Sequence, residues 1–261
     1  MIAALLNRVV PRLLGVLVFA AALGIWEVWA RSEESFLVPP MSAVAERAWQ
    51  VWPTADFLMP VAASLKRLAA GFAIGAGIGV VVGLMMGSSR RTRRTLEPLM
   101  EFSRAIPPVA IVPAAIVVLG LGDAMRIAVI AFAVCFPVLV NTIEGVRVVS
   151  PEARDTASIL HVGSMGRTFR IYLPAALPSI VAGLRIAVSI GLLMVVISEF
   201  LGEGDGLGRY ILFQQSQFNM PEMYGGILFL GLLGYVLNSL FLFAEHRVLT
   251  WHYGAAGVQA P

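Results

Sequence analysis

The sequence predicts an all-α integral membrane protein with six transmembrane helices and both termini in the cytoplasm. The first observation behind this prediction is composition: of 261 residues, 58% are hydrophobic and only 13% are charged. A soluble domain carries about 25% charged residues, so this chain has too little polar surface to cover a soluble globule. The other two observations are the spacing of long apolar stretches and the placement of the arginines.

A helix needs about 20 mostly apolar residues to cross the bilayer core. One domain over residues 1–261 is expected, with transmembrane helices at about 13–30, 68–87, 100–121, 125–144, 175–200 and 223–244. The first stretch could instead be a cleaved signal peptide, since Arg8 and Arg12 precede an apolar centre and small residues lie near Ala30. Its length suits a full span, which favours an uncleaved helix.

The arginines set the orientation. With the N-terminus inside, most of them fall on the cytoplasmic side: Arg8, Arg12, Arg90, Arg91, Arg93, Arg94, Arg147, Arg154, Arg167, Arg170 and Arg247. The positive-inside rule therefore places both termini in the cytoplasm, although Lys66 and Arg67 adjoin the second span on the outer side. The formal net charge of +3 is too small to indicate binding of nucleic acid.

Glycines recur at every fourth position along the second span: Gly71, Gly75, Gly79, Gly83 and Gly87. They share one helix face and allow the backbone of a neighbouring helix to approach closely. A dinucleotide-binding site at 75–79 is disfavoured, because no strand precedes these glycines. We interpret them as a helix-packing surface.

The outer stretch 31–64 is expected to contain a short interfacial helix over 43–52, capped by Ser42. Its apolar residues Val44 and Ala48 fall at helical spacing.

No pattern in the sequence predicts a catalytic site. The single lysine, Lys66, follows Leu65, so no P-loop exists and the chain is not expected to bind a nucleotide. His161, His246 and His252 lie far apart, and no second cluster of ligands accompanies them, so no metal site is expected. The chain is therefore predicted to be no enzyme by itself and to bind no cofactor.

The cytoplasmic loop 147–175 has the strongest local signals. Ser150 and Pro151 form a typical helix start, and Gly163 is expected to end that helix in a left-handed conformation. Ser164 is expected to cap a second helix that ends at Leu173-Pro174. The tip would expose the apolar side chains of Leu160, Val162 and Met165, and exposed apolar groups of this kind usually bind a protein groove.

This loop resembles the EAA loop of permease subunits in bacterial ABC importers. The family pattern reads E-A-A, three residues, G, nine residues, I, any residue, L-P. The matching positions here are Asp155, Thr156, Ala157, Ile171, Leu173 and Pro174, with His161 where the family has glycine.

Further matches extend over nearly the whole chain and are similar to the nitrate/sulfonate/taurine subfamily of permeases. They comprise Pro40 with 42–44, 64–67 with Gly71-Phe72, 106–108 through Pro113, 119–122, 174–178, 183–185, and Glu199 with 206–208.

The resemblance implies a type I ABC importer permease fold in the bacterial inner membrane. It implies a homodimeric pore, two cytoplasmic ATPases that use ATP and Mg, and an external substrate-binding protein. It also implies that the loop docks on the ATPase, with these residues as candidates: Asp155, Thr156, Ala157, Leu160, His161, Val162, Gly163, Ser164 and Met165. The alternative is that 147–175 only lies on lipid headgroups.

Two charges fall within the fifth span. Arg185 and Glu199 are 14 residues apart, which places them on one helix face about 21 Å apart, too far to pair. One hypothesis is that this face lines the pore and that Arg185 attracts an anionic substrate. The alternative is that Arg185 binds Glu144 or a backbone carbonyl.

The third span contains Arg104, which lies three residues from Glu101 and could pair with it. Pro107, together with Pro108 and Pro113, is expected to kink this helix. We therefore take Arg104, Pro107, Arg185 and Glu199 as candidate pore residues. The loop 202–208 is a candidate docking site for the binding protein or a flexible turn.

The subfamily resemblance favours a small anion such as nitrate, sulfonate or taurine, with a vitamin or pyrimidine precursor as the alternative substrate. A self-sufficient secondary transporter or channel would need coupling carboxylates near the bilayer midplane, whereas Glu27, Glu144 and Glu199 all lie toward span ends. A membrane enzyme is disfavoured, since no nucleophile or metal-ligand set converges.

Overall fold

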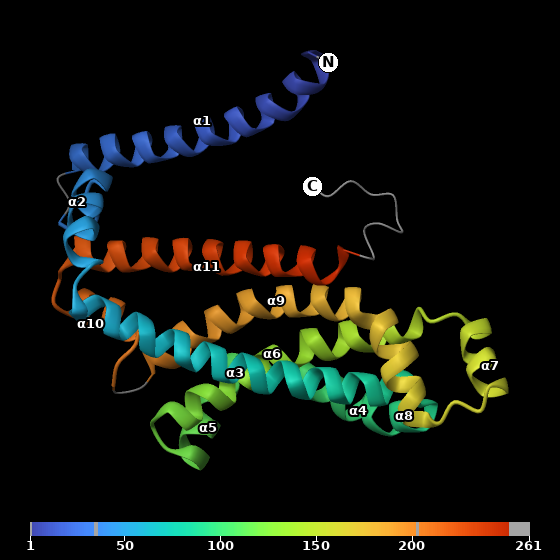
Figure 1. Cartoon of the computed structure of the whole chain (residues 1–261). Helices are drawn as coiled ribbons and strands as arrows, with labels where there is room; N and C mark the ends of the chain where they lie inside the picture. The colour runs from blue at the N-terminus through green and yellow to red at the C-terminus, as the bar shows by residue number, and fades with distance from the viewer. Residues whose placement is uncertain (1, 34–35, 202–203, 251–261) are drawn as a thin grey trace. The chain divides into compact units, whose positions relative to one another are not determined.

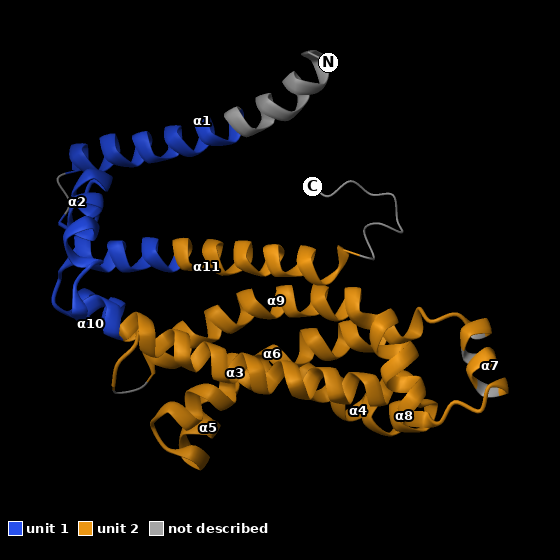
Figure 2. Ribbon diagram, in the orientation of Figure 1, with its two compact units in different colours: residues 1–59, 210–230 blue, residues 60–209, 231–261 orange. Residues whose placement is uncertain are grey.

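The computed structural model describes residues 2–33, 36–201 and 204–250, and every regular element within these ranges is a helix (Figure 1). The chain divides into two compact units (Figure 2). The first comprises Met1–Met59 and Tyr210–Leu230, and the second comprises Pro60–Arg209 and Gly231–Pro261. The second unit contains the loop 147–175 and the five glycines of the expected helix-packing surface.

The first unit contains α1 (Ile2–Glu33), α2 (Met41–Val51), the start of α3 (Ala55–Ser88), most of α10 (Leu207–Ser216) and the start of α11 (Met220–Val248). Aromatic rings hold these pieces together. Phe57 packs edge-to-face on both Tyr210 and Phe229, with ring centroids 5.1 and 4.9 Å away. Arg47 also pairs with Glu222 at 2.6 Å.

The short outer helix forms close to its expected position, and Val44 and Ala48 are its buried residues. The expected cap is wrong, because Pro40 occupies the N-cap position and no side chain caps the helix. The Ser42 hydroxyl instead donates to Glu27 at 2.8 Å, and the Ser42 backbone N–H donates to the same carboxylate at 3.0 Å. Glu27 therefore competes successfully for the group that would otherwise cap the helix.

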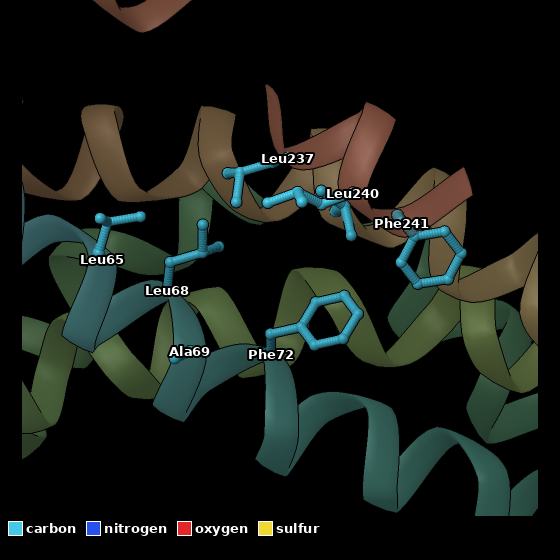
Figure 3. Close-up of a pocket in the computed structure, with 8 residues that line it drawn as sticks. Leu65, Leu68, Ala69, Phe72, Leu237, Leu240 and Phe241 are labelled. Atoms are coloured by element: carbon cyan, nitrogen blue, oxygen red, sulfur yellow. The ribbon is translucent and has the colours of Figure 1, made fainter. Parts of the chain in front are cut away.

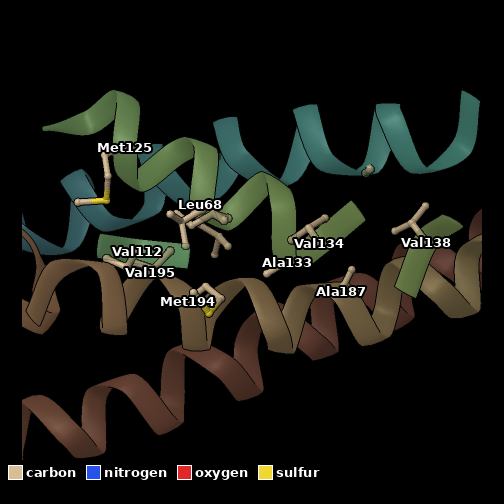
Figure 4. Packing of buried hydrophobic residues seen from close by; sticks show 12 residues of the cluster. Leu68, Val112, Met125, Ala133, Val134, Val138, Ala187, Met194 and Val195 are labelled. Atoms are coloured by element: carbon tan, nitrogen blue, oxygen red, sulfur yellow. The ribbon is translucent and has the colours of Figure 1, made fainter. Parts of the chain in front are cut away.

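The second unit is built around three long helices. Its elements are the remainder of α3, α4 (Arg90–Ala105), η1 (Pro108–Ile111), α5 (Val112–Leu119), α6 (Asp123–Arg147), α7 (Pro151–Ile159), α8 (Ser164–Arg167), η2 (Thr168–Tyr172), α9 (Leu173–Phe200) and the remainder of α11. Leu68 of α3, Val134 of α6 and Met194 of α9 belong to one buried apolar cluster (Figure 4). The α6 helix is the most buried of the candidate spans.

The glycine stripe of α3 lies against α6. A Cβ atom on Gly79 would lie 2.7 Å from the backbone oxygen of Cys135, and one on Gly83 would lie 2.6 Å from Cβ of Thr142. Equivalent close approaches occur at Gly71, Gly75 and Gly87, against Ile130, Ala131 and Val146. In contrast, a Cβ on Gly77 would meet nothing within 4 Å. The four-residue spacing therefore brings the two helix backbones together.

Five helices of the described residues are long and apolar enough to cross a membrane, over Leu14–Glu33, Ala55–Ser88, Asp123–Arg147, Ser164–Phe200 and Met220–Val248. A sixth span would combine α4 with η1 and α5, which are bent by 89°. The expected third span, 100–121, is therefore two helical pieces and not one. The break falls at Ile106-Pro107, as the prolines of this segment predicted.

Candidate functional site

The loop between α6 and α9 begins with a capped helix. The Ser150 hydroxyl oxygen accepts a hydrogen bond from the backbone N–H of Ala153 at 3.3 Å, as the sequence predicted for the start of α7. Hydrogen bonds from its own backbone N–H and from the Ser150 hydroxyl lower the pKa of Glu152. A charged carboxylate in the first turn also suits the positive end of the helix dipole.

The end of α7 differs from expectation. The left-handed residue is His161, with φ of 51°, whereas Gly163 is extended, with φ of −60° and ψ of 160°. The Val162 N–H donates to the Ala157 carbonyl at 3.0 Å, which is the six-to-one bond of a Schellman motif with His161 in the position that usually holds glycine. His161, at the position where the family has glycine, therefore makes this turn, and Gly163 does not.

The second helix of the loop also differs from expectation. Gly163 is its N-cap, and the side chain of Ser164 makes no capping bond. The helix does not stop at Leu173-Pro174, because α8, η2 and α9 form one continuous segment over Ser164–Phe200. The π-helical turn of η2 lies directly before α9, whose second residue is Pro174.

The tip of this loop exposes apolar side chains. Leu160 is 69% exposed and Met165 is 72% exposed, while Val162 is only half-buried. Ile159 and Phe169, which the sequence did not single out, are exposed beside them. Among the other coupling candidates, Ala157 is buried, and the following residues are exposed: Asp155, Thr156, His161, Gly163 and Ser164.

A buried charge cluster lies at the opposite end of the same helix. Glu199, in the last turn of α9, is fully buried and accepts hydrogen bonds from Arg67 at 2.9 Å and from Ser64 at 2.8 Å. The Arg67 guanidinium, 5% exposed, also donates to Asp123 at 2.7 Å and to Asp205. One arginine of α3 therefore joins α6, α9 and the loop before α10.

The described part of the loop before α10 is fitted closely around Glu199. The backbone N–H of Gly208 donates to the Glu199 carboxylate at 2.9 Å, and that of Leu207 donates to the Ser64 hydroxyl at 2.8 Å. Gly206 has φ of +136°, and a Cβ there would overlap the Glu199 carboxylate. The hydrogen bond from Arg67 lowers the pKa of Asp205. The expected loop 202–208 includes residues 202–203, which lie outside the described residues, but 204–208 are anchored.

The structure separates the candidate pore residues. Glu199 belongs to the buried cluster, whereas Arg185 is exposed and makes no hydrogen bond or ion pair with any residue that the structure describes. Glu144 pairs with Arg147 at 2.7 Å and so is not the partner of Arg185. Arg104 pairs with Glu101 at 2.8 Å, as its spacing predicted.

Arg104 also lines a cavity of about 310 Å³ beside the helix break, together with Ile106, Phe136, Asn141 and Ile190 among others. Exposed Pro107 lies at the break itself. The arginine and the amide give this cavity a polar contribution from two helices. The other side chains that line it are apolar, so Arg104 and Asn141 are the groups in this cavity that could bind a hydrophilic solute.

A second cavity, of about 360 Å³, lies between α3, α9 and α11 (Figure 3). All of its lining side chains are apolar: Leu65, Leu68, Ala69, Phe72, Val188, Leu237, Leu240 and Phe241. It offers no group that could bind a charged or polar solute. Among the described residues, no group of three or more histidine, cysteine, aspartate or glutamate side chains could hold a metal ion.

The sequence missed most of the buried cluster. Arg67 and Glu199 are separated by 132 positions, so no local pattern relates them. The available signal was the position of Arg67, because a charge that adjoins a span on the outer side, against the positive-inside rule, needs a partner.

Comparison with known proteins identifies the family of this chain. Residues 75–249 match the family described as "Binding-protein-dependent transport system inner membrane component". The chain is 32% identical over 195 residues to the putative aliphatic sulfonates transport permease protein SsuC of Bacillus subtilis, covering 74% of this chain and 70% of that protein. It is 31% identical over 255 residues to the bicarbonate transport system permease protein CmpB of Synechococcus elongatus, covering 94% and 91%.

The nitrate import permease protein NrtB of Leptolyngbya laminosa is 28% identical over 240 residues, covering 88% of this chain and 85% of that protein. Among solved structures, the inward-facing MetNI methionine ABC transporter is similar in fold, with a TM-score of 0.61 at 19% identity, covering 74% of this chain and 94% of that one. The chain therefore belongs to the family of binding-protein-dependent transport system inner membrane components and is a multi-pass permease subunit of an ABC importer, similar to the nitrate and sulfonate permeases.

Proposed function

We propose that this permease subunit forms, with a second copy of itself, an import pathway for a small anion, and that separate cytoplasmic ATPases drive it by binding the loop tip. The observation that carries the proposal is the exposure of Ile159, Leu160 and Met165 on a loop that hydrogen bonds hold in shape. Apolar side chains exposed on a rigid turn are typical anchors for a protein groove. ATP and Mg would be bound by the ATPase, and an external binding protein would deliver the substrate.

The helix that leaves the tip provides a direct mechanical connection. Ser164–Phe200 is a single helical segment of 37 residues, which begins beside exposed Met165 and ends at the cluster of Glu199 and Arg67. Movement of the tip would therefore be transmitted along one uninterrupted helical segment, which bends between α8 and α9 (Figure 1). Arg167 reinforces the start of that segment, because its Nε donates to the Val162 carbonyl at 3.0 Å.

Arg185 supports an anionic substrate. It lies within the α9 span, is exposed, and lacks a partner among the residues that the structure describes. A charged side chain facing lipid at the centre of the bilayer costs about 2.5–3.5 kcal/mol, so the exposed face of α9 is better placed against water and a second copy. The named substrates of the relatives, aliphatic sulfonates, bicarbonate and nitrate, are anions.

A self-sufficient secondary transporter is less well supported. Its coupling carboxylates would have to be free to exchange ions, but each candidate has an arginine partner. Glu27 pairs with Arg31, Glu144 with Arg147 and Glu199 with Arg67.

The test is uptake of radiolabelled nitrate, sulfonate and bicarbonate into proteoliposomes that contain the permease, its ATPase and its binding protein. We expect uptake that requires ATP, with Arg185→Gln lowering it about tenfold or more and Arg185→Lys restoring most of it, because the lysine keeps the charge. Uptake driven by an ion gradient in liposomes that hold this chain alone would refute the ATP-driven mechanism. Equal uptake by the wild type and Arg185→Gln would refute the role of Arg185.

A further inference from the structure

The helix α4 carries positive charge on two different faces. Arg93 and Arg104 turn toward α6, where they line a cavity of about 190 Å³ that also contains Glu97, Glu101 and Glu144. Each of the two is neutralised, since Arg93 binds Glu97 at 3.0 Å and Arg104 binds Glu101 at 2.8 Å. The inward positive charges of α4 therefore need no external partner.

The outward arginines are different. Arg90, Arg91 and Arg94 are exposed, and none of them forms an ion pair or a side-chain hydrogen bond within the described residues. They also lie in the first turns of a helix, where positive charge opposes the helix dipole instead of complementing it. Three exposed charges without a partner among the described residues leave this end of α4 available to an external anion.

The same outward face becomes apolar toward the break at residue 106. Leu99 is 62% exposed and Phe102 is 68% exposed. Helical periodicity of 3.6 residues places Arg91, Arg94 and Phe102 on one side of α4. The opposite side is the packed one, because Leu96 and Met100 contact the buried cluster of Met86, Leu139 and Ile143.

We propose that the outward face of α4 binds an anionic phospholipid of the cytoplasmic leaflet. The phosphate would lie against Arg91 and Arg94, which the arginine distribution places on the cytoplasmic side. The acyl chain would run along Leu99 and Phe102. A phospholipid has this order of groups, a negative head followed by an apolar chain, whereas a soluble phosphate would leave the two apolar side chains uncovered.

The test compares lipid selectivity of the intact permease–ATPase complex in micelles, using spin-labelled phosphatidylglycerol and phosphatidylcholine with the same acyl chains. We expect the wild type to prefer phosphatidylglycerol. Arg91→Gln/Arg94→Gln should lose about 25-fold of that preference, since each arginine near an anionic surface contributes about 5-fold. The matched control is Arg93→Gln/Arg104→Gln, which removes the same charge from the same helix on its inward face and should keep the preference.

Three results would overturn the proposal. The first is a wild-type complex that binds both lipids equally, and the second is an equal loss in the inward control. The third is an outward variant that keeps its lipid preference but loses the ATPase, which would assign these arginines to the protein partner. Because lipid selectivity is read without transport, failure here would leave the importer function itself unaffected.

Discussion

The two ends of the helical segment Ser164–Phe200 solve opposite problems. At one end, Glu199 is a charge that is fully buried, and Arg67, Ser64 and the backbone of Gly208 satisfy it within the chain. At the other end, Met165 and its neighbour Leu160 are apolar groups that are largely exposed, with nothing in the described structure covering them.

The difference separates structural residues from interacting residues. A buried charge is tolerated only with its partners present, so the complete cluster at Glu199 is expected to stabilise the fold and to need no other protein. Exposed apolar groups on a stiff turn gain free energy only when a partner covers them. Mutations at the two ends should therefore have opposite signatures, one in stability and the other in assembly.

The largest effect is expected from Arg67→Met, which leaves Glu199 buried without its cation. Removing one partner of a buried ion pair typically costs about 3–5 kcal/mol of unfolding free energy. Denaturant unfolding of the purified permease in micelles measures this. The control is Arg147→Gln, which breaks the exposed pair with Glu144 and should cost less than about 1 kcal/mol. Similar costs for the two variants would show that the cluster does not stabilise the fold.

A smaller difference is expected between Gly206→Ala and its control, because a side chain at residue 206 would meet both a left-handed backbone and the Glu199 carboxylate. Gly204→Ala serves as the control, since Gly204 also has positive φ, of +115°, but its Cβ would be 3.6 Å from the nearest atoms of Arg126. We expect about 1–3 kcal/mol of strain at Gly204 and a further 1–3 kcal/mol at Gly206 from the overlap, measured by the same unfolding experiment. Equal costs would mean that the loop does not fit tightly around Glu199.

The smallest effect is expected from His161→Gly at the loop end. Glycine relieves the left-handed strain of about 1–2 kcal/mol but gains disorder in the unfolded state that offsets about 0.5–1 kcal/mol. The net result should be slower hydrogen exchange of the Leu160 and Val162 amides. Gly163→Ala should be tolerated, because Gly163 is extended and its Cβ would have open space. Faster exchange in His161→Gly would contradict the assignment of the turn.

The sequence predicts most of this fold, because apolar length and glycine spacing are local properties. The break at Ile106-Pro107 followed from the prolines, and the start of α7 followed from Ser150. Local rules failed where a distant or competing group determined the outcome. Ser42 binds Glu27 and does not cap α2.

The buried cluster and the loop turn show the same limit. Arg67 and Glu199 meet only after α3 and α9 have packed together, so their pairing cannot be read from spacing. At the loop, glycine preference pointed to residue 163, but the hydrogen bond from Val162 to Ala157 fixes the turn at His161. The turn forms where α7 ends, at Ile159, and not at the nearest glycine.

The most direct test of the account measures ATPase affinity and unfolding free energy in one variant, Leu160→Asp/Met165→Asp. Both side chains are exposed, so we expect unchanged stability, within about 0.5 kcal/mol, together with at least a tenfold loss of ATPase affinity, as is usual when apolar anchors of an interface are lost. Unchanged ATPase affinity, or a stability loss as large as that of Arg67→Met, would contradict the assignment of the loop tip as an interface.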